Sequence, residues 1–432
     1  MEQLIKKANL GLDALKAGGA DQASCAVSRT VVREINVEQG DFTLYRTLYE
    51  DHVSFQAIAD GRRGVLSQNN VTEDAIRDGA RQCLQSAEAA DPDEAWQLAP
   101  SVGEHTFVEG ALTCDEAKLI ERFEGFLDDV KTQFPKIHLE QVIVTHTVKE
   151  SAAVFSTGSI LKAQRGAYEI STMFNAQESD KASSFFGNGV LFTSLDTPFI
   201  ELGSIAEDFA LVSDQVHTDH VTGKFEGTVL MTPDCVRGFI GSALDLFTAD
   251  GSILNKTSLW LDRLGERVAD PRLTISLAPH HPDIILGDRY SQEGYLSEDF
   301  SPIEHGVLKS FTISDHAARK TGYERAKNMS FNVVVEPGDT SVEAIIQGID
   351  RGLLIARFSG GMPSSNGDFS GVAKNAFLIE NGEVKEALSE TMIAGNFADA
   401  LMNIRAISKE TVNDGSGIVP WVALDGIVIS GK

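Results

Sequence analysis

Apolar residues recur at helical spacing in several separate stretches of the chain. Residues 1–20, 71–90 and 114–132 each predict an amphipathic helix of ordinary length. A further helix is predicted after Thr232, an N-cap residue, because Pro233 suits a first helical position that needs no N–H donor. Its apolar positions form one continuous stripe, which predicts a buried helix: Val236, Phe239, Ile240, Ala243, Leu244 and Phe247.

Alternating apolar and polar stretches between the helices predict antiparallel strands joined by tight turns. Asn381-Gly382 separates AFLIE from EVKEAL, and both central residues of a type I′ hairpin turn need φ > 0. Gln39-Gly40 and Asp60-Gly61 predict similar turns in an N-terminal meander. Residues 302–313 predict another hairpin, and WVALDGIVISGK predicts a closing strand.

Two further helix starts are predicted in the C-terminal part of the chain. Thr340–Glu343 (TSVE) has the spacing of a capping box, in which the first side chain accepts a hydrogen bond from the helix backbone. Asn396 predicts the N-cap of a helix whose apolar residues follow i, i+3, i+4, i+7 spacing: Phe397, Ala400, Leu401 and Ile404.

The order of these elements predicts the fold class and the domains. Strands and helices do not alternate regularly, so we expect an α+β fold of mainly antiparallel sheets with packed helices. A chain of 432 residues is long enough for two to three domains. The expected division is an N-terminal α+β domain over residues 1–100, a central domain over 101–225 and a larger β-rich domain over 226–432. The polar, Pro-containing residues 91–104 predict a boundary or a long crossing loop.

Composition narrows the class of protein. With 42% hydrophobic and 23% charged residues, the chain is typical of globular proteins. It has no signal-peptide core and no apolar run long enough to cross a bilayer, so a cytoplasmic protein without membrane contact is expected. The net charge of −26 gives no attraction to phosphate backbones, which disfavours nucleic-acid binding. The scattered cysteines predict reduced thiols in or near the core: Cys25, Cys83, Cys114 and Cys235.

The usual motifs for nucleophilic catalysis and nucleotide binding are missing. The sequence has no GxSxG elbow, P-loop or GxGxxG. His217 and His220 have an i, i+3 spacing that could chelate a metal on a helix, but their β-branched neighbours favour an extended or loop setting. His280-His281 and His305 are interpreted as turn residues. We expect no metal ligand among these histidines.

The loop SGGMPSSNGDFSG, residues 359–371, is the remaining candidate for a functional site. Its glycines could let a peptide backbone approach closely. The alternative is a long hairpin loop that needs residues at φ > 0. The candidate peptide-contact residues are Asn366, Gly367, Asp368, Phe369 and Ser370.

The segment from Arg357 to Asn396 resembles the C-terminal part of the TldD/PmbA peptidase family, and Asp368-Phe369 match a GD/GE-[FY] motif of that family. The family's TldD-type subunits open the helix after strand GTVLM with HExxxH, whose histidines hold zinc while the Glu acts as general base. They also carry a cysteine ligand near the C-terminus. Here Pro233 and Asp234 stand in place of His-Glu, Gly238 replaces the second His, and residues 413–421 contain no cysteine.

This pattern is similar to the PmbA/TldE branch, the subunit without metal. The resemblance implies no catalytic residue, no metal ligand and no cofactor in this chain, with zinc held by a TldD-like partner subunit. It further implies a homodimer when alone and a cytoplasmic pair that processes unstructured peptides, inactive without the partner. Two alternatives stay open: a non-catalytic regulatory protein of the gyrase-modulator type, and a self-contained metallohydrolase whose site includes His217 and His220.

Overall fold

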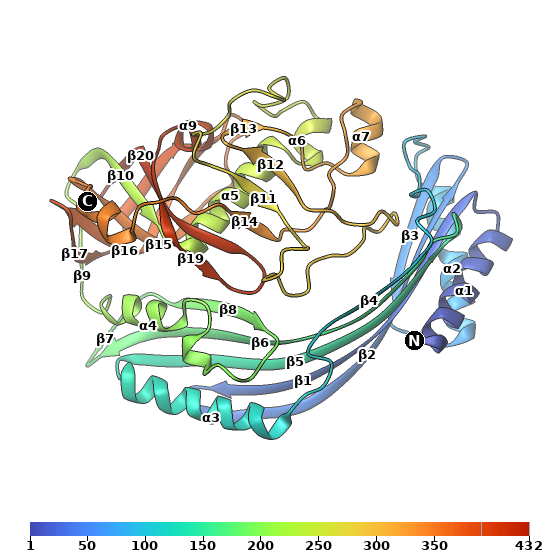
Figure 1. Ribbon diagram of the computed structural model, residues 1–432, viewed down its shortest axis with the longest axis horizontal. Coiled ribbons are helices and arrows are strands. Elements are labelled where there is room, and N and C mark those ends of the chain that lie inside the picture. Colours follow the sequence, from blue (N-terminus) through green and yellow to red (C-terminus); the bar gives the residue numbers. More distant parts are fainter. Residues whose placement is uncertain (390, 432) are drawn as a thin grey trace.

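The computed structural model describes residues 1–389 and 391–431, which form two β-sheets with helices packed on them (Figure 1). Glu390, within the segment from Arg357 to Asn396, and Lys432, at the end of the predicted closing strand, lie outside the described residues. Most strand pairs are antiparallel, and the helices pack around the sheets rather than alternating with parallel strands. The predicted α+β class is therefore confirmed.

The first sheet is long and curved, and its strand order is β3-β2-β1-β5-β6-β4 (Figure 1). All of its pairs are antiparallel except that of β4 with β6. Its members are β1 (Gln22–Glu38), β2 (Asp41–Ala59), β3 (Arg62–Gln68), β4 (Glu104–Gly110), β5 (Ile137–Phe155) and β6 (Ile160–Glu178), with β7 (Lys181–Ala182) and β8 (Phe186–Phe192) paired to β6. Strands before and after residue 100 pair directly, so this sheet does not divide at that position.

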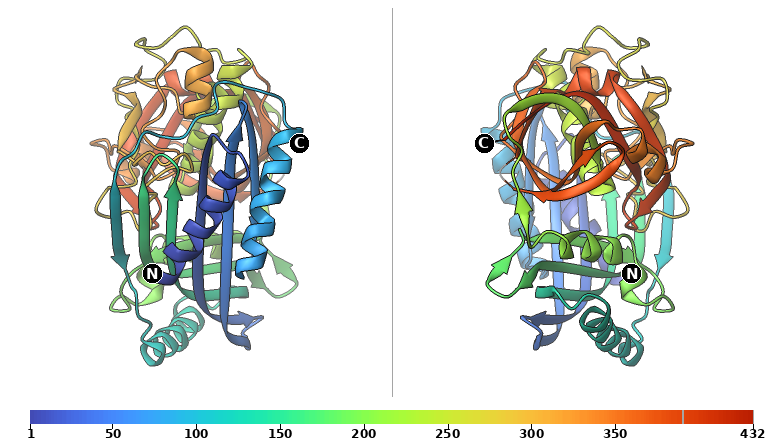
Figure 2. Two further views of the ribbon diagram at one scale, coloured as in Figure 1. Left: turned by 90° about the vertical axis from the view of Figure 1, so that its right-hand side faces the viewer. Right: turned by 90° about the vertical axis from the view of Figure 1, so that its left-hand side faces the viewer.

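Helices cover the two ends of this sheet separately. At one end α1 (Glu2–Ala17) and α2 (Glu73–Ala89) pack side by side (Figure 2). Their apolar faces meet Cys25 and Phe55 of the sheet in one buried cluster. At the other end a second cluster joins the sheet to α3 (Glu116–Gln133), η1 (Phe199–Glu201) and α4 (Ile205–Ser213). The three N-terminal helices predicted from spacing are confirmed.

The second sheet contains a closed ring of strands. Its order is β13-β12-β11-β14-β20-β10-β15-β16-β17-β9, and β18 pairs with both β16 and β20. Because β20, β10, β15, β16 and β18 pair in succession, they close on themselves (Figure 2). The strands of the ring are β10 (Lys224–Met231), β15 (Arg351–Gly360), β16 (Asp368–Glu380), β18 (Thr391–Asn396) and β20 (Ile418–Ser430).

The remaining elements extend or cover this ring. The other strands are β9 (Thr218–Asp219), β11 (Ile275–Leu277), β12 (Phe300–Glu304), β13 (Val307–Leu308), β14 (Val333–Val335), β17 (Glu383–Leu388) and β19 (Ile404–Asn413). The helices are α5 (Pro233–Phe247), α6 (Asp250–Leu254), α7 (Asp315–Thr321), α8 (Val342–Gln347) and α9 (Phe397–Met402). Within the described residues, no helix combines the length and apolar character that a bilayer crossing needs.

The predicted tight turns are confirmed by their backbone angles. Asn381 and Gly382 have φ of 53° and 77°, and Asp60 and Gly61 have φ of 50° and 70°. Positive φ at both central residues is the signature of the type I′ turn that suits a right-handed hairpin twist. The same signature is found at Gln39-Gly40 and at His305-Gly306.

The predicted cap is confirmed at Asn396 but is wrong by one residue at TSVE. Asn396 accepts hydrogen bonds from the backbone N–H groups of Ala398 and Asp399. At the start of α8, Ser341 is the N-cap, whereas the Thr340 hydroxyl donates to Asp339 instead. Ile404 is also outside the helix predicted for it, because α9 ends at Met402 and Ile404 begins β19.

The cysteines are all unpaired, as predicted, and they lie in or near the core. Cys25, Cys83 and Cys235 are buried, and Cys114 is half-buried. Burial raises the pKa of the Cys25 thiol to about 12 and that of Cys83 to about 11. These thiols therefore stay protonated and behave as small apolar groups.

Alanine substitutions at two turn glycines separate backbone strain from steric conflict. Gly382→Ala is expected to lower stability more than Gly61→Ala, because a Cβ at Gly382 lies 2.7 Å from the Gln347 carbonyl oxygen. At Gly61 the nearest atom lies 3.8 Å away, so that variant has only the left-handed strain of about 1–2 kcal/mol. Urea unfolding of both variants measures the difference, and equal losses would contradict the steric contribution.

Candidate functional site

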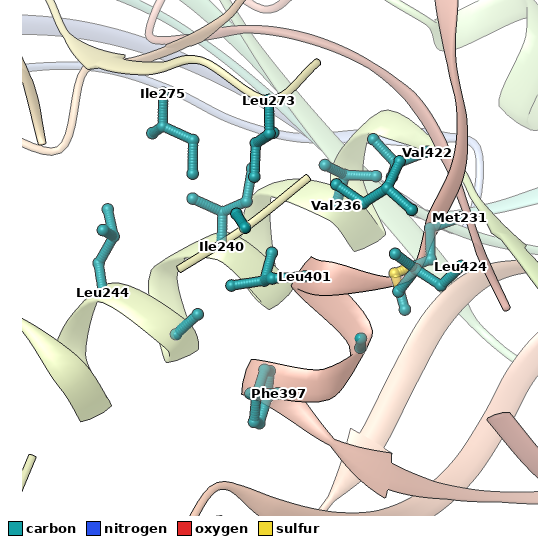
Figure 3. Packing of buried hydrophobic residues seen from close by; sticks show 14 of the residues in the cluster. Met231, Val236, Ile240, Leu244, Leu273, Ile275, Phe397, Leu401, Val422 and Leu424 are labelled. Atoms are coloured by element: carbon teal, nitrogen blue, oxygen red, sulfur yellow. The ribbon is translucent and has the colours of Figure 1, made fainter. Parts of the chain in front are cut away.

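A cavity of about 480 Å³ lies beside the first turns of α5 and the glycine-rich loop after β15. α5 begins at Pro233, and Thr232 precedes it in an extended conformation, with its hydroxyl directed to the Ala356 carbonyl rather than to the helix. The buried side of α5 lies in the main core of the second sheet (Figure 3). The other side lines the cavity through residues spaced i, i+4, i+8: Asp234, Gly238 and Ser242.

The opposite wall of the cavity comes from the hairpin between β15 and β16. Gly360, Gly361, Met362 and Pro363 line it, and Met362 is almost fully exposed. A Cβ added at Gly361 would have no atom within 4 Å, so open space adjoins the loop backbone there. A peptide backbone could therefore approach this segment without meeting side chains.

Aromatic rings hold the loop against α5 and α9. The Phe369 ring centroid lies 5.9 Å from that of Phe239, 5.6 Å from Phe358 and 4.9 Å from Phe397. These edge-on and tilted arrangements are the favourable ones for aromatic pairs, and together they form the apolar floor of the cavity. Phe369 is thus both a core residue and a lining residue.

Asn366 and Asp368 are engaged in the local structure of the loop. The Asn396 side-chain amide donates to the Asn366 carbonyl at 2.8 Å and to an Asp368 carboxylate oxygen at 3.0 Å. Hydrogen bonds from Asn396 and Asn366 lower the pKa of the Asp368 carboxyl. Gly367 has φ of 90°, as the hairpin-loop interpretation requires.

Of the five predicted peptide-contact residues, only Phe369 lines the cavity. The four others, Asn366, Gly367, Asp368 and Ser370, lie outside its lining. Their contact with a peptide stays a prediction. The neighbouring wall, Gly360–Pro363, belongs to the loop predicted as the candidate site, but the predicted contact residues did not include it; glycines with Met and Pro at an exposed hairpin end were the signal for it.

An ion pair joins α5 to the turn between β19 and β20. Arg237 pairs with the Asp414 carboxylate and donates to the Ser416 hydroxyl at 2.8 Å. Asp414 also accepts hydrogen bonds from the backbone N–H groups of Ser416 and Gly417. The family resemblance would place a cysteine ligand in this turn. In this chain the turn instead forms an ion pair with α5.

Acidic groups near the cavity are shifted toward their neutral forms. Asp234 keeps contact with solvent, although protein atoms surround it closely. Desolvation and the nearby Asp414 carboxylate raise the pKa of Asp234, and Arg237 lowers it. Asp208 of α4 is buried, and burial raises its pKa to about 7, with Asp234 adding to the shift. Burial likewise raises the pKa of the Cys235 thiol to about 12, so Cys235 is no nucleophile.

These residues do not suit a zinc ion of the kind that a metallopeptidase uses. At the start of α5 the lining offers one carboxylate, a protonated buried thiol and a glycine, whereas catalytic zinc needs three protein ligands. Among the described residues, no group of three His, Cys, Asp or Glu side chains could hold a metal ion. The residues at this site therefore do not fit a catalytic zinc ion, and the expectation of no metal in the chain stays a prediction.

The histidines singled out from the sequence lie apart from this cavity. His217 contacts Glu178 at 2.8 Å, while His220 contacts the Ser389 hydroxyl at 3.2 Å. They flank β9, so the extended setting predicted for them is confirmed. His280 contacts the Ser297 carbonyl oxygen at 3.0 Å, and His305 lies in the turn between β12 and β13.

A larger cavity of about 720 Å³ lies between the first sheet and residues 286–293. Two of the cationic residues that line it are already engaged, because Arg165 and Arg289 both pair with the Glu109 carboxylate, at 2.9 and 2.5 Å, while Lys149 is a third. We therefore regard the cavity beside α5 as the better candidate, since it joins the two segments that the sequence singled out.

Comparison with known proteins identifies the class. Residues 222–431 match the PmbA/TldA metallopeptidase C-terminal domain. The metalloprotease PmbA of Escherichia coli O157:H7 is 23% identical over 95% of this chain and 94% of its own length. A PmbA homolog of Haemophilus influenzae is 28% identical over 48% of this chain, and the match spans about half of that relative (46%).

Among solved structures, TldE from Thermococcus kodakarensis has the same fold, with a TM-score of 0.83, 21% identity and full coverage of both chains. Fold and similarity together define a protein of a metallopeptidase family. Residues 222–431 belong to the PmbA/TldD family as its C-terminal domain, and the similarity to PmbA extends over the rest of the chain. The family predicted from the segment between Arg357 and Asn396 is thereby confirmed.

Alanine at two helical glycines of α5 tests the open space at the cavity. Gly238→Ala is expected to raise stability by about 0.5–1 kcal/mol, because a Cβ there meets nothing within 4 Å and alanine favours the helix. Gly241→Ala should raise stability less, because its Cβ would lie 2.9 Å from the Phe331 ring. Thermal unfolding compares the two, and a larger gain at Gly241 would argue against the space described.

The buried Asp208 carboxyl predicts a pH dependence of stability. Because an unfolded Asp titrates near pH 4 and Asp208 near 7, the folded chain binds more protons between these values, and stability falls as pH rises through this window. Asp208→Asn should flatten this decline, on the order of a few kcal/mol at most. Glu201→Gln, an exposed carboxylate in the neighbouring η1, is the matched control; Glu207 is unsuitable because its charge adds to the raised pKa of Asp208. Urea midpoints from pH 4 to 8 measure the slope; an unchanged slope in Asp208→Asn would refute the assignment.

Proposed function

We propose that this chain is the subunit without metal in a TldD/TldE-type peptidase pair, and that its cavity beside α5 forms one wall of a chamber for unstructured peptides. The observation that carries the proposal is a peptide-sized cavity at a helix start, where Asp234 is the sole carboxylate among the described lining residues and Gly238 adds no side chain. By the family resemblance, the start of this helix corresponds to the segment that carries the zinc ligands in the partner subunit. The pair would act in the cytoplasm, and the chain alone would form a homodimer.

The chain's own residues would bind and orient the peptide in this proposal. The backbone of Gly360 and Gly361 borders the cavity, so an extended peptide could exchange main-chain hydrogen bonds with it. The floor of phenylalanine rings would take apolar side chains and exclude water. Metal, general base and bond cleavage would belong to the partner, and no step of hydrolysis is assigned to this chain.

A mixing assay tests the proposal. The chain, a purified TldD-like partner that carries HExxxH, and both together are incubated with an unstructured peptide, and cleavage is followed by mass spectrometry. We expect cleavage to rise on mixing. No gain would favour the regulatory alternative, and stoichiometric zinc with cleavage by the chain alone would favour the self-contained metallohydrolase.

A cavity-filling variant tests the role of the site within the pair. Gly238→Phe is expected to lower kcat/KM of the mixed proteins by about tenfold or more, because the ring would occupy the space assigned to the peptide. Gly238→Ala is the matched control and should leave cleavage nearly unchanged. Sedimentation of the mixture shows whether the pair still assembles. Full activity with Gly238→Phe would contradict the placement of the peptide.

A further inference from the structure

A separate cavity of about 440 Å³ lies where β17 and β18 diverge along β16. β18 pairs with β16 as far as Ala373, and β17 pairs with it from Ala376 onward. Asn375 lies between these two points and lines the cavity. Gln215 also lines it, from the short connection between α4 and β9 beside the ring of strands (Figure 1).

Two buried amide side chains in this cavity are only half satisfied. The Asn375 Nδ2 group donates to the Gln215 Oε1 atom at 2.7 Å, and each residue is only 4% exposed. The Gln215 Nε2 and Asn375 Oδ1 atoms have no hydrogen-bond partner among the described residues. Buried polar groups are nearly always paired, and leaving a donor and an acceptor unpaired lowers stability.

The result does not depend on how oxygen and nitrogen are assigned in the two amides. If both side chains were flipped, Gln215 would donate to Asn375, and one NH₂ group and one carbonyl oxygen would again be left over. The amide pair at the cavity wall therefore leaves one donor and one acceptor unpaired among the described residues in either case. A ligand that complements both must itself carry an acceptor and a donor close together.

The backbone at Asn375 supports a functional interpretation. Its φ is 49°, a left-handed conformation within a strand at a buried, non-glycine position. Such strain persists only where the surroundings hold it, and it concentrates at ligand and active sites. The pairing with Gln215, 160 positions away in sequence, is one of the contacts that hold it.

We propose that this cavity binds an amide group, whose carbonyl oxygen accepts from the Gln215 side chain while its N–H donates to Asn375. Two sources have this chemistry: the carboxamide of an Asn or Gln side chain, and one residue of an extended peptide, whose N–H and C=O point to the same side. Val372, Leu388 and Met392 line the same cavity and would contact the aliphatic part of the ligand. This site shares no lining residue with the cavity beside α5, so it does not rest on the peptidase proposal.

Three blocked amino acids with one backbone distinguish the sources. The full chain is titrated by calorimetry with N-acetylglutamine N-methylamide, the glutamate analogue and the norleucine analogue. Binding of the glutamine probe alone supports side-chain carboxamide recognition, and equal binding of all three supports backbone recognition. If none of them binds at millimolar concentration, the proposal is overturned.

Variants of Gln215 tie the binding to the site. Gln215→Met should weaken binding by about tenfold or more, since it removes the donor at similar side-chain volume. Gln177→Met is the matched control, because Gln177 donates to Asn175 at 3.2 Å in another amide pair outside the cavity. Gln215→Glu is the second variant, for use if Gln215→Met fails to fold. It keeps the acceptor for Asn375 but replaces the free donor, so it should also weaken binding. Unchanged affinity in the folded Gln215 variants, or a probe seated elsewhere in a structure of the complex, would overturn the assignment.

Discussion

The burial of α5 is the constraint on which the C-terminal part of the molecule depends. Val236, Ile240 and Leu244 lie among side chains from β11, β20 and α9, segments that are far apart in the sequence (Figure 3). Burial of each such side chain contributes about 1.5–3 kcal/mol, an upper estimate because unfolded chains already bury some apolar surface. With that stripe directed to the core, Asp234 and Gly238 must face the other way. The position of the cavity thus follows from the apolar spacing of one helix.

The loop beside α5 is held by a helix cap rather than by a ligand. The side-chain oxygen of Asn396 caps α9, and the nitrogen of the same amide donates hydrogen bonds to Asn366 and Asp368. The Asn396 side chain therefore links the start of α9 to the start of β16. The next residue of β16, Phe369, packs its ring in the core. This accounts for a glycine-rich loop with a well-defined base and an open tip. The residues that resemble the family motif define the base, whereas the space for a ligand lies at the tip.

Local signals in the sequence were sufficient for much of the fold. Asn381-Gly382, Asn396 and the apolar stripe of α5 each encode their structure within a few residues, so turn, cap and helix could be predicted. The candidate site was predicted only in part, because the loop was identified but only Phe369 of the predicted contact residues lines the cavity. TSVE failed because two hydroxyl residues adjoin there, and Ser341 rather than Thr340 accepts the hydrogen bond from the Ala344 N–H. The features that were not predicted all join segments that are distant in sequence. They are the closed ring, the Arg237–Asp414 pair and the Gln215–Asn375 pair. Tertiary packing determines these contacts, and local residue spacing carries no information about them.

β16 relates the two cavities to each other, because Phe369 lines one and Asn375 lines the other. Six residues of strand at about 3.3 Å each separate these positions by about 20 Å. An extended peptide that reaches from Phe369 to Asn375 must therefore contain about six residues, although the two linings also meet across the strands, where Arg357 pairs with Lys374. If long peptides bind more tightly than their halves, the amide site extends the same binding surface. If not, it serves a ligand of its own, and the strand between them separates two independent sites.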